Sequence, residues 1–117
     1  MILTAEEKAT LHEFFRQKGL FHHIENWPEF MDVLEHIDGG NIEWGVRNDF
    51  AVHQALAAVM KRNESFRSLL REIAADRRRS KLVFANSSNE ALKKRLLEKI
   101  NSAVLELRQM FYDALRP

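Results

Sequence analysis

The C-terminal segment carries the pattern that most constrains how this chain can fold. Apolar side chains recur between Leu92 and Leu115 at spacings of three and four residues, and on a helical wheel they fall within an arc of roughly 140°. This spacing predicts one helix from about Ser88 to Leu115 with a single buried face. At ~1.5 Å per residue that helix is roughly 42 Å long, whereas a globular domain of this size is roughly 35 Å across. We therefore expect the helix to carry more apolar surface than its own domain covers.

Four shorter helices are predicted before this segment. A capping box formed by Thr4 and Glu7 begins the first helix, and the glycine after Lys18 ends it. Apolar residues spaced three to four apart and flanking caps indicate the other three. The predicted ranges are 5–18, 27–37, 50–62 and 64–78. The fold class is therefore all-α, a compact bundle of four to six helices with a long C-terminal helix.

A break is expected before the last helix. The apolar run Leu82–Ala85 is followed by turn-forming residues up to Asn89, and Ser87 with Glu90 forms a second capping box. The run has two interpretations: it is a short segment that plugs the core, or it is an anchor into a partner through Phe84. The chain is expected to form a single domain (1–117), and any internal boundary would lie near 79–88.

The sequence indicates no reactive site. Cysteine is absent, which excludes disulfides and thiolate chemistry. The five histidines all lie in the first half and show no i, i+4 pair of the kind that binds metal on a helix. Glycine-rich phosphate loops and nucleophile motifs are also missing. We expect no enzyme activity, no metal and no cofactor, with His53 as a hydrogen-bonded side chain at the edge of the core.

Hydropathy gives no indication of a membrane or of secretion. The longest apolar run, Ala55–Met60, is far shorter than the ~20 residues that span a bilayer. Charged residues interrupt the first twenty positions, so no signal-peptide pattern occurs there. These features predict a soluble, cytoplasmic protein with no membrane partner.

Charge is divided unevenly along the chain. Up to Ala58 there are 4 Lys and Arg against 10 Asp and Glu, and from Val59 onward there are 14 against 7, which gives −6 and +7. Such polarity favours association guided by charge. Two interpretations are open: the halves attract each other within one fold, or they direct binding to another copy or an acidic partner.

Basic residues gather on the helix 64–78 and beyond it. Arg67, Arg71 and Arg78 share one side of that helix, and the cluster continues through Arg79, Lys81, Lys94 and Arg95. Guanidinium groups suit phosphates, so this patch could bind nucleic acid or an acidic protein. The net charge of only +1 and the lack of interleaved aromatic residues favour a solvated helix end instead.

A second apolar register lies on the back of the last helix. Leu105 and Tyr112 are seven residues apart and about 20° from each other on the wheel, away from the main stripe. Aromatic residues are enriched at interfaces. The predicted protein interface comprises Leu105, Arg108, Tyr112 and Phe84. The leading hypothesis is a non-enzymatic interaction or adaptor module that dimerises or docks on a larger protein through the long helix. A nucleic-acid-binding regulator is the alternative.

Overall fold

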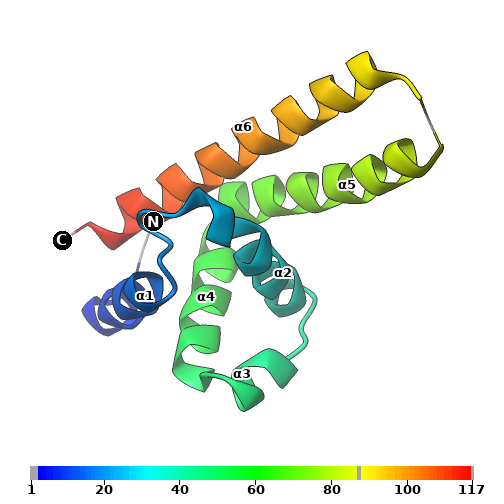
Figure 1. The fold of residues 1–117 in the computed structure, drawn as a ribbon. Coiled ribbons are helices and arrows are strands. Elements are labelled where there is room, and N and C mark those ends of the chain that lie inside the picture. Colours follow the sequence, from blue (N-terminus) through cyan, green and yellow to red (C-terminus); the bar gives the residue numbers. More distant parts are fainter. Residues whose placement is uncertain (1–2, 87, 117) are drawn as a thin grey trace.

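The computed structural model describes residues 3–86 and 88–116 (Figure 1). Within this part the chain forms helices and no strands, so the all-α prediction with a long C-terminal helix is confirmed. The molecule measures 48 × 28 × 26 Å. The elements in chain order are α1 (Ala5–Gln17), the 3₁₀ turn η1 (Ile24–Asn26), α2 (Trp27–Asp38), α3 (Glu43–Arg47), α4 (Phe50–Arg62), α5 (Glu64–Asn86) and α6 (Glu90–Leu115).

Local chemistry accounts for the ends of α1. The backbone N–H of Thr4 donates to Glu7 Oε1 at 2.9 Å, and the backbone N–H of Glu7 donates to Thr4 Oγ1 at 3.1 Å. This reciprocal pair satisfies two amide groups that a helix start leaves open. Beyond the C-terminal end, Gly19 has a φ of +67°, which glycine adopts without steric cost. The predicted first helix is therefore confirmed at both ends.

The predicted break after Arg78 is wrong, because α5 continues to Asn86. No glycine or proline interrupts this stretch, and α6 packs along it, with Ser80 buried and Val83 half-buried. The helix thus crosses the region where an internal boundary was considered. Asn89 caps α6, since its side chain accepts from the backbone N–H of Leu92 at 3.1 Å. Ser87, which was expected to provide this cap, lies outside the described residues.

Helix α3 is not among the helices predicted from the sequence. It packs directly on α4 because Gly45 has no side chain: a Cβ at this position would lie 2.6 Å from His53 Cβ. The His53 ring stacks on Phe50 with a centroid separation of 5.8 Å. His53 Nδ1 is buried and has no hydrogen-bond partner in the described part of the chain, so the hydrogen bond expected for this side chain is not made at Nδ1.

Aromatic side chains fill the core of the body, a name used here for residues 3–63 together with the ends of α5 and α6 that pack on them. Trp27, Phe15, Phe66 and Phe111 are fully buried. The Phe111 ring lies 4.8 Å from the Phe66 ring and 5.1 Å from the Phe15 ring between centroids, distances at which aromatic pairs attract each other. The last turns of α6 thereby join α1 and the start of α5.

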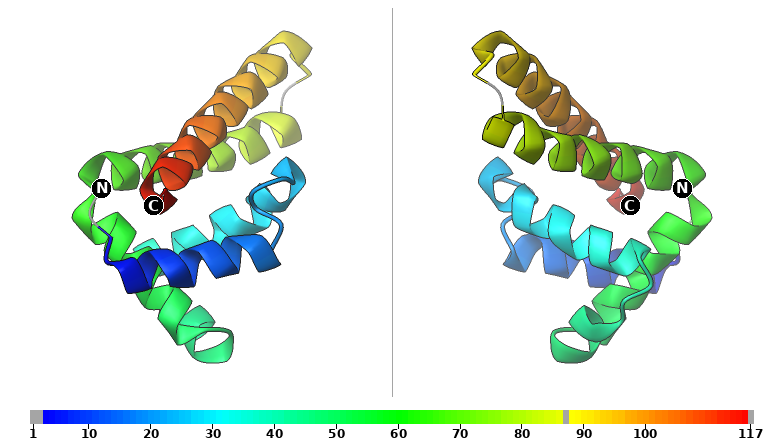
Figure 2. Two further views of the ribbon diagram at one scale, coloured as in Figure 1. Left: turned by 90° about the vertical axis from the view of Figure 1, so that its left-hand side faces the viewer. Right: turned by 90° about the vertical axis from the view of Figure 1, so that its right-hand side faces the viewer.

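Helices α5 and α6 form an antiparallel hairpin that extends beyond the body (Figures 1 and 2). We call the outer end of this hairpin, residues 79–86 and 88–97, the tip. The α6 helix is uninterrupted over 26 residues, as predicted, and α5 lies beside its outer half. Part of the apolar surface of α6 is therefore covered by a second long helix that sequence reasoning had ended too early.

Candidate interaction site

The acidic side of α2 pairs with the basic side of α5. Arg71 donates from Nε and Nη2 to the two carboxylate oxygens of Asp38, at 3.0 and 3.2 Å, and these hydrogen bonds raise the pKa of Arg71. Arg77 donates to Glu35 at 3.1 Å and to Asp32 at 3.0 Å. Three carboxylates of the acidic half thus meet cations of the basic half. This arrangement fits the interpretation that the two halves attract each other within one fold.

Pairing divides the predicted basic patch into two groups. Arg71, Arg78 and Arg79 lie within ion-pair distance of carboxylates, with Arg78 3.6 Å from Glu35 and Arg79 3.7 Å from Asp76. Arg67 is half-buried beside the body. The other group is exposed and makes no ion pair within the described residues; it comprises Lys81, Lys94 and Arg95. The patch therefore does not form one continuous free surface, and its exposed members without an ion pair in the described residues lie at the tip.

An ion pair between a buried aspartate and an exposed lysine joins the two helices of the hairpin. The Asp76 side chain is only 4% exposed, and Lys99 Nζ lies 3.0 Å from its Oδ2. Lys99 also lies 3.8 Å from Glu72. A buried charge without a partner is costly, so this contact favours one register of α5 against α6.

Tyr112 and Arg108 belong to the body, and the expectation that they face outward with Leu105 is wrong. The Tyr112 hydroxyl donates to the backbone carbonyl of Leu20 at 2.8 Å and accepts from Arg108 Nη2 at 3.0 Å. The Arg108 guanidinium also lies 5.7 Å from the Trp27 ring centroid. The segment after α1 covers this side of α6, a contact that the wheel of α6 alone could not reveal. Leu105 stays exposed.

The tip combines exposed apolar side chains with positive charge. Leu82 is 66% exposed, and three further large apolar side chains are 41–43% exposed: Phe84, Leu92 and Leu97. The interpretation that Leu82–Ala85 plugs the core is therefore wrong. Five cations and one anion lie in the described residues of the tip: Arg79, Lys81, Lys93, Lys94, Arg95 and Glu90. Lys93 Nζ lies 5.7 Å from the Phe84 ring centroid, within the range of a cation–π contact.

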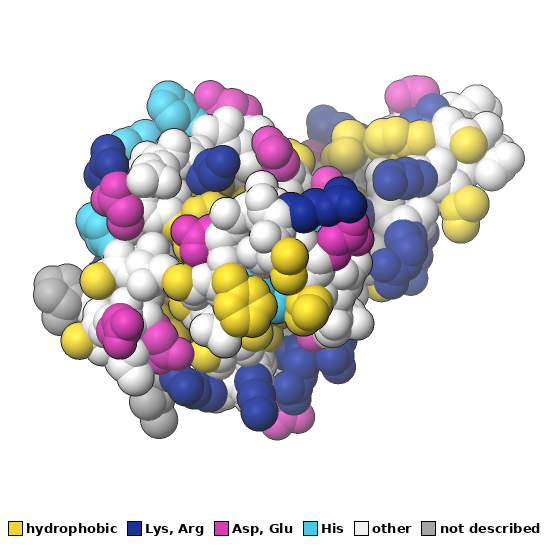
Figure 3. Space-filling model, turned by 90° about the horizontal axis from the view of Figure 1, so that it is seen from below, with side chains coloured by type: hydrophobic (Ala, Val, Ile, Leu, Met, Phe, Trp, Pro, Cys, Tyr) yellow, Lys and Arg dark blue, Asp and Glu magenta, His cyan; other side chains and the backbone are white. Residues whose placement is uncertain are grey.

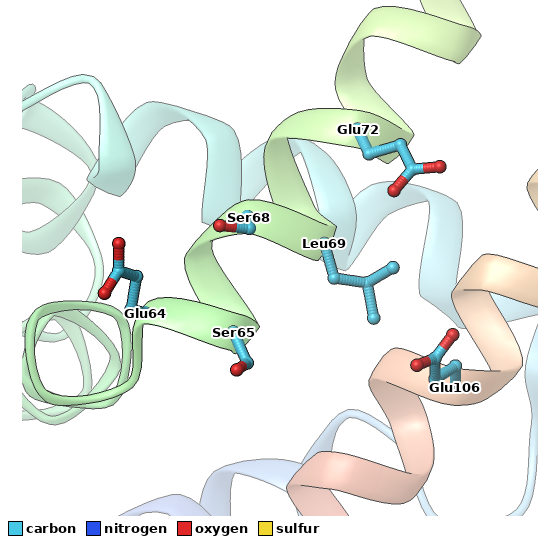
Figure 4. A pocket seen from close by; sticks show the side chains of 6 residues that line it. All are labelled: Glu64, Ser65, Ser68, Leu69, Glu72 and Glu106. Carbon is cyan, nitrogen blue, oxygen red and sulfur yellow. The ribbon is translucent and has the colours of Figure 1, made fainter.

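Nearer the body, the same hairpin carries an open acidic depression of about 530 Å³. Figure 4 shows Leu69 pointing from α5 toward Glu106 on α6, with Glu72 further along α5. The remaining lining residues are Glu64, Ser65 and Ser68. Sequence reasoning missed this feature, because only the register of α5 against α6 brings Glu72 and Glu106 to one place.

Sequence reasoning also missed two features at the α3 end of the body. Ile42, Val46 and Phe50 are exposed, and a group of apolar side chains is visible when the molecule is viewed from below (Figure 3). Their four-residue spacing was the available signal. Beside them a cleft of about 600 Å³ has aromatic side chains and both signs of charge in its lining, among them Phe14, Phe30, Trp44, Lys18, Glu29, Arg47 and Asp49.

Among residues 3–86 and 88–116, no group of three or more His, Asp or Glu side chains is arranged to hold a metal ion. Over the same ranges, no helix combines the length and apolar character needed to cross a membrane. Comparison of the chain with protein-family models, with curated proteins and with solved structures finds no match.

Proposed function

We propose that this protein is a non-enzymatic interaction module that binds a protein partner through its α5–α6 hairpin. The observation that carries the proposal is the tip, where large apolar side chains and unpaired cations lie together beyond the body. Leu82 and Phe84 add nothing to the aromatic core, so their exposure is not explained by folding of the body. Burial of apolar surface contributes about 25 cal/mol per Å² to the free energy of binding, so these side chains favour binding of a partner at the tip.

The charge of the tip indicates the kind of protein that fits it. Five cations against one anion attract an acidic surface and accelerate encounter with it. Nucleic acid is a weaker match, because Arg71, Arg78 and Arg79 lie near carboxylates and a phosphate would compete with them. An acidic protein surface can use both the cations and the apolar side chains of the tip.

Capture from a lysate of the native cells tests this proposal. The full chain is immobilised as wild type, as the tip variant Leu82→Ser/Phe84→Ser, and as the control variant Val46→Ser. Val46 is as exposed as Leu82 but lies on α3. Circular dichroism confirms that all three fold. We expect specific partners to be lost with the tip variant and kept with the control.

The opposite result contradicts the proposal. If the tip variant retains every partner and Val46→Ser loses them, the α3 end of the body is the binding surface. Binding of wild type to a mixed DNA duplex at low salt, with affinity that falls steeply as salt rises and with Lys94→Ala, would favour nucleic acid instead.

A further inference from the structure

The hairpin carries charges that are related by an approximate two-fold symmetry along its length. On α5, Glu72 and Arg79 are seven residues apart and about 20° from each other on the helical wheel. On α6, Glu106 and Arg95 are eleven residues apart and again about 20° from each other. In each helix the anion is nearer the body and the cation is at the tip.

Both pairs have their midpoints at the same level of the hairpin. The midpoint on α5 falls between Ala75 and Asp76, and the midpoint on α6 falls between Ile100 and Asn101. The ion pair of Asp76 with Lys99 shows that these levels lie side by side. The pattern is therefore a property of the assembled hairpin rather than of either helix alone.

The helical wheels assign all four charged side chains to one face of the hairpin. Glu72 and Glu106 line the acidic depression, and Arg79 and Arg95 follow about two and three turns further toward the tip on the corresponding sides of their helices. We call this surface the outer face. Ala75, an exposed small residue near its middle, allows another helix to approach closely.

We propose that two copies of this chain pair through their outer faces, with the hairpins antiparallel, so that each tip covers the acidic depression of the other copy. A two-fold axis at the level of Ala75 brings Arg79 of one copy against the position of Glu72 in the other; within its own copy, Arg79 also lies 3.7 Å from Asp76 and Glu72 lies 3.8 Å from Lys99. The same operation brings Arg95 against the position of Glu106. Such a pairing is isologous and closes at two copies. This inference goes beyond the proposed function, because on the wheel of α5 Phe84 lies about 140° from Arg79 and so away from the outer face.

Apolar contacts and area are consistent with a reversible dimer. Leu92 at the tip and Met110 near the body occupy the same angular position on α6, with a midpoint at Asn101. Two adjacent helices over about 30 Å offer roughly 600 Å² per copy. This is somewhat less than the about 800 Å² of a standard interface. We therefore expect a dissociation constant in the micromolar range.

Charge-reversal variants, measured separately and as a mixture, test this dimer. Sedimentation velocity on the full chain, from low to high micromolar concentration, measures the self-association of wild type, Arg95→Glu and Glu106→Arg. Each variant places like charges at two contacts of the dimer, so we expect each to weaken association by at least about tenfold. An equimolar mixture of the two variants makes both contacts attractive again and is expected to restore association.

A second charge pair and a control variant complete the design. Arg79→Glu and Glu72→Arg form an independent pair with the same expected pattern, in case either α6 variant does not fold. Arg47→Glu reverses an exposed charge on α3 and is expected to leave association unchanged.

Two results would overturn the proposal. One is a wild type that stays monomeric at the highest concentration, and the other is a mixture that associates no better than its separate components. If either occurs while the tip variant Leu82→Ser/Phe84→Ser still loses its captured partners, the interaction module stands and only the self-pairing is wrong.

Discussion

The body and the tip use the same kinds of residue in opposite ways. In the body, Phe15 and Trp27 are fully buried and in contact with other rings. At the tip, Leu82 and Phe84 are 66% and 43% exposed on a helix that the body does not cover. Residues of the first kind determine whether the chain folds, and those of the second are free to serve binding. Mutations in the two regions should therefore separate stability from association.

The largest expected difference in stability is between alanine variants of two phenylalanines. Phe15→Ala removes a fully buried ring and should lower the free energy of unfolding by about 3–5 kcal/mol. Phe84→Ala should lower it by less than about 1 kcal/mol, because this ring is 43% exposed. Urea unfolding followed by circular dichroism measures both. Equal losses would show that the tip contributes to the stability of the body.

A glycine substitution tests how tightly α3 is packed on α4. Gly45→Ala places a Cβ 2.6 Å from His53 Cβ and should cost about 1–3 kcal/mol, since α3 must shift away from α4. Gly39→Ala is the control, because a Cβ at this position would lie 3.4 Å from its nearest neighbour, the carbonyl oxygen of Glu35. Thermal unfolding compares the two variants. No loss of stability with Gly45→Ala would show that α3 is packed only loosely on α4.

Two arginines, one beside the body and one at the tip, test the same difference in stability within α5 and α6. Arg77→Met removes a partly buried contact with Glu35 and an exposed contact with Asp32, and should destabilise the protein by about 1–2 kcal/mol. Arg95→Met, at the tip, removes no ion pair present in the described residues and should leave stability unchanged. Chemical denaturation at low and moderate salt checks this, and an equal effect from both variants would contradict the distinction.

The smallest expected effect concerns two glutamates in first helical turns. The hydrogen bond from the Thr4 backbone N–H, followed by contacts with Arg62, lowers the pKa of Glu7 below 4.5. A carboxylate with a lowered pKa in the folded state stabilises the fold above its unfolded pKa, and this contribution is lost as pH falls through the folded pKa.

Glu7→Gln should therefore cost roughly 0.5–1 kcal/mol at neutral pH, and the difference from wild type should disappear as pH falls below 4.5. Glu90→Gln at the start of α6 is the control, because the Glu90 side chain is largely exposed. Unfolding curves at a series of pH values measure both. A cost that persists unchanged in acid would exclude the carboxylate as its source.

Local signals predicted the parts of the fold that depend on local chemistry. The cap at Thr4 and the glycine after Lys18 bounded α1 correctly, and the apolar stripe from Leu92 to Leu115 predicted an unbroken α6. Residues 79–86 were misassigned because their helical state depends on α6, a partner that follows in sequence. Helix α3 was missed for a similar reason, since its five residues pack on α4 through the close approach of Gly45 to His53.

The candidate site was predicted only in outline. Phe84, Leu105, Lys81, Lys94 and Arg95 are exposed, as a surface role requires. Tyr112 was misplaced because the wheel of α6 contains no information on the segment Leu20–Phe21 that packs against it. The acidic depression and the charge symmetry could not be seen in the sequence, because both arise from the register that Asp76 and Lys99 establish.

The placement of the tryptophans makes the two regions separately observable. Trp27 and Trp44 are the only two in the chain, and both lie in the body. Intrinsic fluorescence therefore reports melting of the body alone, whereas far-ultraviolet dichroism draws much of its amplitude from the 23 residues of α5 and the 26 of α6. If the outer hairpin frays before the body, the dichroism midpoint will fall below the fluorescence midpoint.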